Sequence, residues 1–164
     1  MEQLHLSFEQ QLLQALLQRG LTFAAAESCT GGLIAKRITD LSGASAVFRG
    51  GVVSYTNEVK RDVLDVPQPL LDEYGAVSGE VAKAMAEGVR RITGADLAVS
   101  VTGVAGPNRD DCGNEVGTVF FGIATAEDTR FLNMHFQGDR HAIRQQAADF
   151  AFTLLFNETK EYCR

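Results

Sequence analysis

The 164-residue sequence predicts one α/β domain, residues 1–164, in which helices cover both faces of a mixed sheet. Two observations support this fold class. The first half alternates helical segments with short apolar strands, as parallel strands joined by crossover helices do. In the second half, residues 115–125 and 129–137 are two apolar strands separated by a short turn, which favours an antiparallel hairpin. We therefore expect a three-layer sandwich whose sheet is mostly parallel, with an antiparallel edge.

Caps and glycines mark the elements of the first half. Ser7 and Gln10 form a capping pattern at the start of a helix whose apolar face includes Leu12 and Leu16, and Gly20 ends it. The next expected elements are a buried strand, a helix and a second strand, at residues 21–27, 31–43 and 47–55.

A short helix is expected over residues 56–66, with Thr56 or Asn57 as its cap and Pro67 as its end. Pro69 is expected to keep the following chain extended. The clearest helix comes next, over residues 78–94. It is capped by Ser78 and closed by Gly94, and its apolar face comprises Val81, Met85, Val89 and Ile92. A buried strand at 95–103, the hairpin strands and a final helix from about Asp139 complete the chain.

Bulk composition excludes several classes of protein. The hydrophobic fraction of 45% and the charged fraction of 22% are typical of globular domains. A net charge of −6 argues against binding to a nucleic-acid backbone, which requires clustered lysine and arginine. No apolar run is long enough to span a membrane, and the N-terminus resembles no secretory signal, so we expect a cytoplasmic protein without membrane partners.

The cysteines and histidines do not form a metal-binding pattern. The cysteines, at positions 29, 112 and 163, include no C-x-x-C pair, and the histidines, at positions 5, 135 and 141, are scattered. Reduced thiols fit this arrangement better than disulfides. We therefore expect neither a metal nor another cofactor.

The segment "AAAESCTGGLIAK" places Ser28 at a turn between a buried strand and a helix. Such a turn presents a hydroxyl beside free backbone N–H groups, and Gly31 and Gly32 permit an anion or a carbonyl oxygen to approach closely. The alternative is that Ser28 only caps the helix, a role for which Thr30 also competes. Alternation along the strand turns Cys29 toward the core, where a thiol acts as a small apolar group.

Lys60 is a candidate base for Ser28. It lies near the start of the helix that follows the strand "GGVVSY", and the positive end of a helix lowers the pKa of an amine. A neutral amine there takes the proton of a serine, and Tyr55, just before that helix, orients or relays it. The alternative is an ordinary solvated lysine on the helix surface.

Two further stretches offer ligand contacts. In "VTGVAGP", Gly103 and Gly106 flank a turn after a buried strand, where the Thr102 hydroxyl and the loop N–H groups hold a ligand. In "GDRHAIRQQ", Arg140 and Arg144 lie four residues apart on one helix face, a spacing that permits both to bind a phosphate. Taken separately, each signal also fits a plain turn or a pair of surface arginines.

Five stretches together resemble the C-terminal domain family of the competence/damage-inducible protein CinA. They are "AAAESCTGG", "GGVVSYTNEVKRDVLDV", "GAVSGEVAKAMAEG", "ADLAVSVTGVAGP" and "GDRHAIRQQA". The resemblance runs from about Leu12 to Phe156, in the same order and spacing. The chain resembles a stand-alone form, without the N-terminal domain of longer CinA proteins.

This resemblance implies hydrolysis of the carboxamide of nicotinamide mononucleotide to nicotinate mononucleotide and ammonia, without a metal. It implies that Ser28 is the nucleophile, Lys60 its base, Tyr55 a proton relay and Arg140 a ligand for the substrate. Thr30, Gly31, Gly32, Thr102, Gly103, Gly106 and Arg144 complete the expected substrate contacts. We expect a small mononucleotide as the ligand and a homo-oligomer, with a dimer favoured.

One loop departs from the family pattern. After "AGP" the family has glycines and then a Lys-Pro pair, whereas this chain has "NRDDCGNEVG", with Glu115 before Val116. The acidic loop Asn108–Glu115 should hold an anionic nucleotide less well, and Arg109 compensates in part. Two other functions therefore stay open. One is a regulatory module that binds a pyridine mononucleotide without turnover, and the other is an interaction protein linked to competence or DNA damage.

Overall fold

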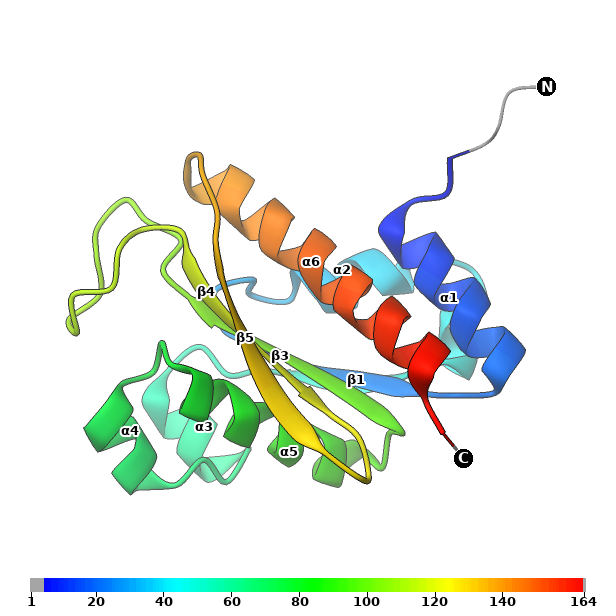
Figure 1. Ribbon diagram of the computed structural model, residues 1–164, viewed down its shortest axis with the longest axis horizontal. Coiled ribbons are helices and arrows are strands. Elements are labelled where there is room, and N and C mark those ends of the chain that lie inside the picture. The colour runs from blue at the N-terminus through cyan, green and yellow to red at the C-terminus, as the bar shows by residue number, and fades with distance from the viewer. Residues whose placement is uncertain (1–4, 164) are drawn as a thin grey trace.

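The computed structural model describes residues 5–163, and within this range a five-stranded sheet lies between two layers of helices (Figure 1). The sheet has the strand order β2-β1-β3-β4-β5. Strand bounds are Phe23–Glu27 for β1, Phe48–Val53 for β2, Leu97–Gly103 for β3, Thr118–Ala124 for β4 and Thr129–His135 for β5. Strand β1 pairs in parallel with β2 and β3, whereas β4 pairs antiparallel with β3 and β5. The expected mixed sheet with an antiparallel edge is confirmed.

Helices cover both faces of this sheet. One layer holds α1 (Phe8–Arg19), α2 (Leu33–Thr39) and α6 (Arg140–Glu161), and a short 3₁₀ turn, Ala44–Ala46, follows α2. The other layer holds α3 (Asn57–Asp62), α4 (Gln68–Tyr74) and α5 (Gly79–Thr93). Each layer closes its own apolar core against the sheet. No helix within residues 5–163 is long and apolar enough to cross a bilayer.

The local signals read from the sequence set most helix ends. The Ser7 hydroxyl accepts a hydrogen bond from the Gln10 N–H, and the Gln10 side chain accepts one from the Ser7 N–H, which is a complete capping box. Gly20, which follows α1, adopts the left-handed conformation with φ of 62°. Of the two candidate caps for α3, the structure uses Thr56, whose hydroxyl accepts from the Val59 N–H.

Two expectations about the helices are wrong. Pro69 does not keep the chain extended, because it lies in the first turn of α4, a helix absent from the sequence-based element order. Proline fits there because first-turn N–H groups have no partner within the helix. Ile92 does not pack with the buried face of α5, since about half of its surface is exposed. It lies in the last turn of α5, which ends at Thr93.

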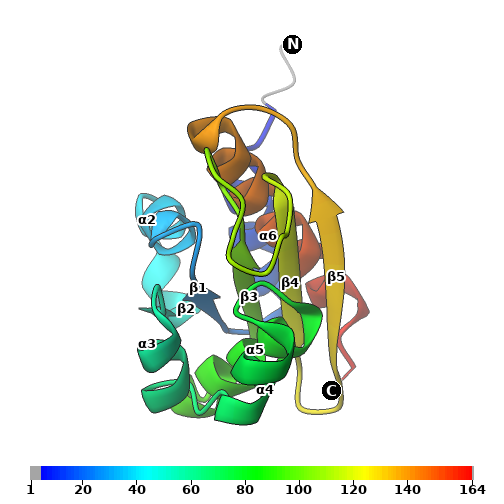
Figure 2. The same ribbon diagram turned by 90° about the vertical axis from the view of Figure 1, so that its left-hand side faces the viewer.

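The carboxyl ends of the three parallel-paired strands, β1, β2 and β3, meet on one side of the sheet. Figure 2 faces this side, with α2 and α3 at the left and the orange start of α6 at the top. The segments after β1 and β2 carry the candidate serine and lysine, and the candidate threonine, Thr102, lies at the end of β3 itself.

Candidate active site

The Ser28 hydroxyl and the Lys60 amine lie within hydrogen-bonding distance, with 2.9 Å between Oγ and Nζ. Ser28 directly follows β1, and Lys60 lies in α3, shortly after β2. In the parallel pairing of these strands Glu27 stands opposite Val53, so the segments after them leave the sheet side by side. Sheet pairing therefore brings together two side chains that are 32 residues apart.

Lys60 is buried without a carboxylate partner. Only 1% of its surface is exposed, and its Nζ also donates to the backbone oxygen of Ser54 at 2.7 Å. None of the ion pairs within residues 5–163 involves Lys60. Burial removes the ammonium from water and thereby lowers the pKa of Lys60 to about 8. Burial is thus the main cause of the lowered pKa of Lys60.

The neighbouring thiol has the opposite character. Cys29 is buried in the core on the α6 side of the sheet, as its alternation with Ser28 predicts. Burial raises the pKa of Cys29 to about 12, so the thiol keeps its proton at neutral pH. A protonated, buried thiol is a poor nucleophile, which leaves Ser28 as the reactive group of the turn.

Ser28 and Lys60 open into a cavity of about 290 Å³. Ten residues from five parts of the chain line it: Ser28, Cys29, Tyr55, Lys60, Ala76, Val77, Thr102, Gly103, Ala105 and Arg140. Six of the residues proposed from the sequence therefore converge here, namely Ser28, Tyr55, Lys60, Thr102, Gly103 and Arg140. This cavity has room for a substrate group next to the serine.

Arg140 joins the two sides of the cavity mouth. Its guanidinium donates to the Gly106 backbone oxygen at 2.7 Å and to the Tyr55 hydroxyl at 3.2 Å. In Figure 2 the start of α6, where Arg140 lies, stands above the other elements of this side. The Thr102 hydroxyl donates to the Ala76 backbone oxygen at 2.7 Å, so its oxygen lone pairs are left to accept. These two side chains add to the polar groups that Ser28, Tyr55 and Lys60 place in the cavity wall.

Five other predicted site residues do not line the cavity: Thr30, Gly31, Gly32, Gly106 and Arg144. Gly106 contributes indirectly, through its backbone oxygen. Arg144 donates to the backbone oxygens of Cys29 and Thr30, at 3.0 and 2.9 Å, so it does not form one phosphate clamp with Arg140. The structure thus brings one arginine of the pair to the cavity and directs the other to the turn behind it.

The capping alternative for Ser28 and Thr30 does not hold. The Glu27 carboxylate caps α2 instead, because it accepts from the N–H groups of Ile34 and Ala35 at 2.8 and 3.1 Å. The Thr30 hydroxyl is buried and has no hydrogen-bond partner among the described residues. Sequence reasoning missed Glu27, because it ends β1 and reaches the start of α2 only across the turn at residues 28–32.

The loop that departs from the family pattern lies beside the cavity wall. The Asn114 amide donates to the backbone oxygen of Val77 at 3.3 Å, and the Asp110 carboxylate accepts from the Asn114 N–H at 2.7 Å. Arg109 and Glu115 form an exposed ion pair at 3.6 Å. None of the loop residues is among those that line the cavity. The acidic side chains therefore border the site without entering it.

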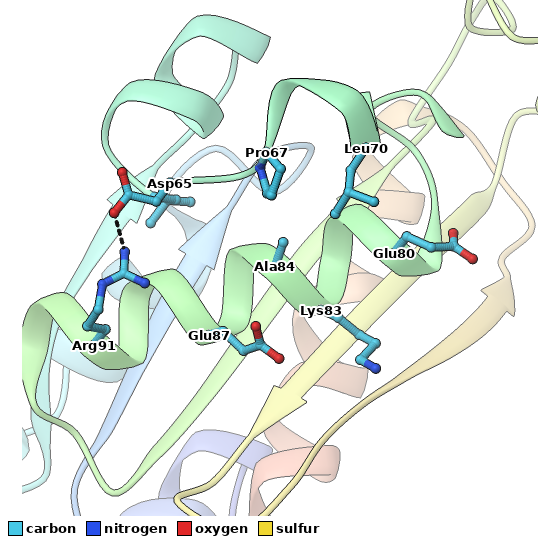
Figure 3. A pocket seen from close by; sticks show the side chains of 9 residues that line it. Asp65, Pro67, Leu70, Glu80, Lys83, Ala84, Glu87 and Arg91 are labelled. Atoms are coloured by element: carbon cyan, nitrogen blue, oxygen red, sulfur yellow. Dashed lines mark hydrogen bonds and ion pairs between the residues drawn. The ribbon is translucent and has the colours of Figure 1, made fainter. Parts of the chain in front are cut away.

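A second hollow, of about 370 Å³, lies between α4 and α5 (Figure 3). Leu70 and Ala84 form apolar parts of its lining, and an ion pair of 2.8 Å joins Asp65 to Arg91 across one end. No serine, cysteine, histidine or tyrosine lines it. The nucleophile and the base thus place the chemistry in the cavity at the strand ends.

The fold and the cavity beside Ser28 and Lys60 define a three-layer α/β protein with a candidate serine–lysine site. The family model of the CinA C-terminal domain matches residues 5–159, and the chain belongs to that family. A CinA-like protein of Geotalea daltonii is 56% identical over 139 residues, which cover 85% of this chain and 34% of the relative. This chain thus spans about a third of the length of such curated relatives.

Solved structures give the same assignment. A CinA superfamily protein from Klebsiella pneumoniae superposes with a TM-score of 0.92 at 33% identity, covering 94% of this chain and 97% of the other. The competence/damage inducible protein CihA from Agrobacterium tumefaciens superposes with a TM-score of 0.87 at 34% identity, with coverage of 96% and 98%. The α/β fold and the family predicted from the sequence are both confirmed.

Proposed function

We propose that this chain hydrolyses the carboxamide of nicotinamide mononucleotide to nicotinate mononucleotide and ammonia, with Ser28 as nucleophile and Lys60 as general base. The observation that carries the proposal is the 2.9 Å contact between Ser28 Oγ and a buried lysine amine at a cavity wall. The choice of substrate rests on the resemblance to the CinA family. A homo-oligomer, with a dimer favoured, is proposed on the same basis.

The first half-reaction forms an ester on Ser28. The neutral Lys60 amine accepts the Ser28 proton while Oγ attacks the carboxamide carbon. The Ser54 backbone oxygen accepts an N–H of the amine and so directs its lone pair toward Ser28. The carbon–nitrogen bond then breaks, and the proton held by Lys60, relayed by Tyr55, leaves with ammonia.

The second half-reaction releases the acid. Lys60 takes a proton from a water molecule that attacks the ester carbon, and the bond to Oγ breaks with return of the proton to Ser28. Arg140, at the mouth of the cavity, is the cation that faces the anionic part of the substrate. Thr102 offers its hydroxyl oxygen as an acceptor within the same wall.

A decisive experiment incubates the purified protein with nicotinamide mononucleotide and measures both products. Ammonia and nicotinate mononucleotide should appear in equal amounts, because one amide bond yields one of each. Formation of nicotinamide instead would indicate cleavage of the glycosidic bond and would contradict the proposal.

One observation favours a second candidate function, a module that binds a pyridine mononucleotide without turnover. The acidic loop 108–115, where the family has glycines and a Lys-Pro pair, is fixed against the cavity wall by Asn114. Calorimetric binding of nicotinamide mononucleotide without release of ammonia is the result that this alternative predicts.

The rate should rise with pH through about 8. Lys60 accepts a proton only when it is neutral, and burial lowers the pKa of Lys60 to about 8. Below that pH the amine is protonated, so kcat/KM should fall about tenfold for each pH unit. Initial rates between pH 6 and 9 check this, and a flat profile over that interval would exclude Lys60 as the base.

Turnover should survive chelation. Residues 5–163 contain no group of three or more histidine, cysteine or carboxylate side chains arranged to hold a metal ion. Activity measured after prolonged treatment with a chelator and gel filtration should equal that of untreated protein. Loss of activity that zinc or manganese restores would show that a metal takes part.

A further inference from the structure

The first three residues of the turn that presents Ser28 all accept hydrogen bonds at their carbonyl groups. The Ser28 oxygen accepts from the Gly31 N–H at 3.1 Å, and the Ser28 N–H donates to the Val101 oxygen of the neighbouring strand at 2.9 Å. The oxygens of Cys29 and Thr30 both accept from Arg144. Such a turn has little freedom to change its peptide orientations, because each one is tied to the rest of the fold.

Arg144 reaches this turn from α6, more than a hundred residues away in the sequence. Its Nε and Nη2 bind two successive carbonyls, in the forked geometry that only a guanidinium offers. Arg144 does not line the cavity, whereas Arg140, one helical turn earlier, does. The two arginines thus have different partners: Arg140 binds groups at the cavity mouth, and Arg144 binds the backbone of the Ser28 turn.

Gly31 leaves the space that this guanidinium occupies. Its φ is +60°, a conformation that favours glycine, and a Cβ at this position would lie 3.2 Å from Arg144 Nη2. The glycine was expected from the sequence to face an anion of the substrate. The contacts instead place it against the positively charged side chain that supports the turn.

From these contacts we propose that Arg144 is a positioning residue, which fixes the Ser28 turn so that Oγ stays within reach of Lys60. The inference rests on the proposed amidase function. Arg144 acts through the backbone and makes no contact with the substrate. Its loss therefore slows the chemical step and leaves substrate binding unchanged.

The first test compares kcat and KM of Arg144→Met and Arg144→Lys with those of the parent. A displacement of a reacting group by 1 Å costs about 100-fold in rate, and we expect a loss of that order in kcat for Arg144→Met. Arg144→Lys keeps the charge but lacks the fork, so it should retain an intermediate rate. KM for nicotinamide mononucleotide should stay within about twofold for both variants, because the contacts that bind the substrate before the reaction are not altered.

Arg19→Met is the matched control. Arg19 also binds several backbone carbonyls, those of Thr159, Lys160 and Tyr162, but at the far end of α6. Its loss removes the same kind of contact without touching the Ser28 turn. We expect a comparable fall in Tm for Arg19→Met and Arg144→Met, and a fall in kcat for Arg144→Met alone.

A second measurement does not depend on the natural substrate. A fluorophosphonate probe reacts when serine Oγ bonds to phosphorus, fluoride leaves with the bonding electrons, and the base takes the serine proton. The rate of Ser28 labelling, followed by intact mass, should fall in both Arg144 variants and remain at the parent value in Arg19→Met. If the parent lacks amidase activity but is labelled, the proposed amidase function is wrong. The labelling rates of the variants still decide the role of Arg144.

Three outcomes would overturn the inference. One is a rise in KM with unchanged kcat, greater for nicotinamide mononucleotide than for nicotinamide riboside, which would make Arg144 a phosphate ligand. Another is equal loss of activity in Arg144→Met and Arg19→Met, which would make the effect one of general stability. The third is the absence of any difference in Ser28 labelling between the parent and the Arg144 variants, whether all are labelled at the same rate or the parent is not labelled at all.

Discussion

Replacement of Ser28 by alanine is expected to abolish amidase activity, with a loss of at least about 10³-fold in kcat, while the fold is retained. Alanine removes only the hydroxyl oxygen, and the backbone contacts of the turn do not involve it. The Lys60 amine keeps its hydrogen bond to the Ser54 oxygen. Ammonia release is the activity measurement, and circular dichroism with thermal unfolding checks the fold.

Cys29→Ala is the control for this experiment. The thiol is adjacent to Ser28 in the turn, but it is buried, and burial raises the pKa of Cys29 to about 12. Its replacement should lower Tm slightly, through the small cavity that it leaves, and preserve turnover. If Cys29→Ala abolishes activity and Ser28→Ala does not, the assignment of the nucleophile is wrong.

Lys60→Arg is expected to inactivate the protein as completely as Lys60→Ala. Arginine keeps the positive charge but does not give up its proton, so it provides no base for Ser28. Lys60 is only 1% exposed, and a guanidinium is larger than an amine. Thermal unfolding of both variants is therefore measured beside activity, to check that each is folded. Binding of nicotinamide mononucleotide, measured by calorimetry, should change little in either variant that remains folded.

Lys60→Met separates charge from packing. Methionine fills the space of the lysine stem without a charge or a base, so this variant should also be folded and inactive. If Lys60→Arg keeps most of the activity while Lys60→Met loses it, Lys60 acts as an electrostatic clamp on the substrate. Some other group would then accept the proton of Ser28.

The elements that the sequence predicts correctly are those with a strong local signal. The capping box at Ser7 and the glycine after α1 mark their helix in a few letters. The sequence does not reveal helix α4 because proline is compatible with two structures: it favours an extended residue before it, and it also fits the first turn of a helix. The sequence alone does not decide between these two structures, because the choice depends on packing against α5.

The candidate site also has features that the sequence predicts and features that it does not. The meeting of Ser28 with Lys60 follows from parallel pairing of the strands before them, and that pairing is predictable from the strand–helix–strand order. The burial of Lys60, which is the main cause of its lowered pKa, depends on how the segments after three strands close over it. The partners of Arg144 are backbone oxygens, which every residue possesses, so the sequence contains no sign of them.

Among the described residues no carboxylate pairs with Lys60, and this has a consequence for the release of ammonia in the proposed mechanism. An ammonium whose pKa is about 8 is a stronger acid than an ordinary lysine, whose pKa is about 10.4. After it has accepted the Ser28 proton, Lys60 is a cation in a desolvated wall, with the Ser54 oxygen as a neutral hydrogen-bond acceptor. Donation of that proton to departing ammonia is therefore downhill, whereas a carboxylate next to Lys60 would retain the proton and delay the release. The burial that lets the Lys60 amine accept a proton near neutral pH also makes its ammonium form a better proton donor. One side chain therefore serves in both directions of proton transfer.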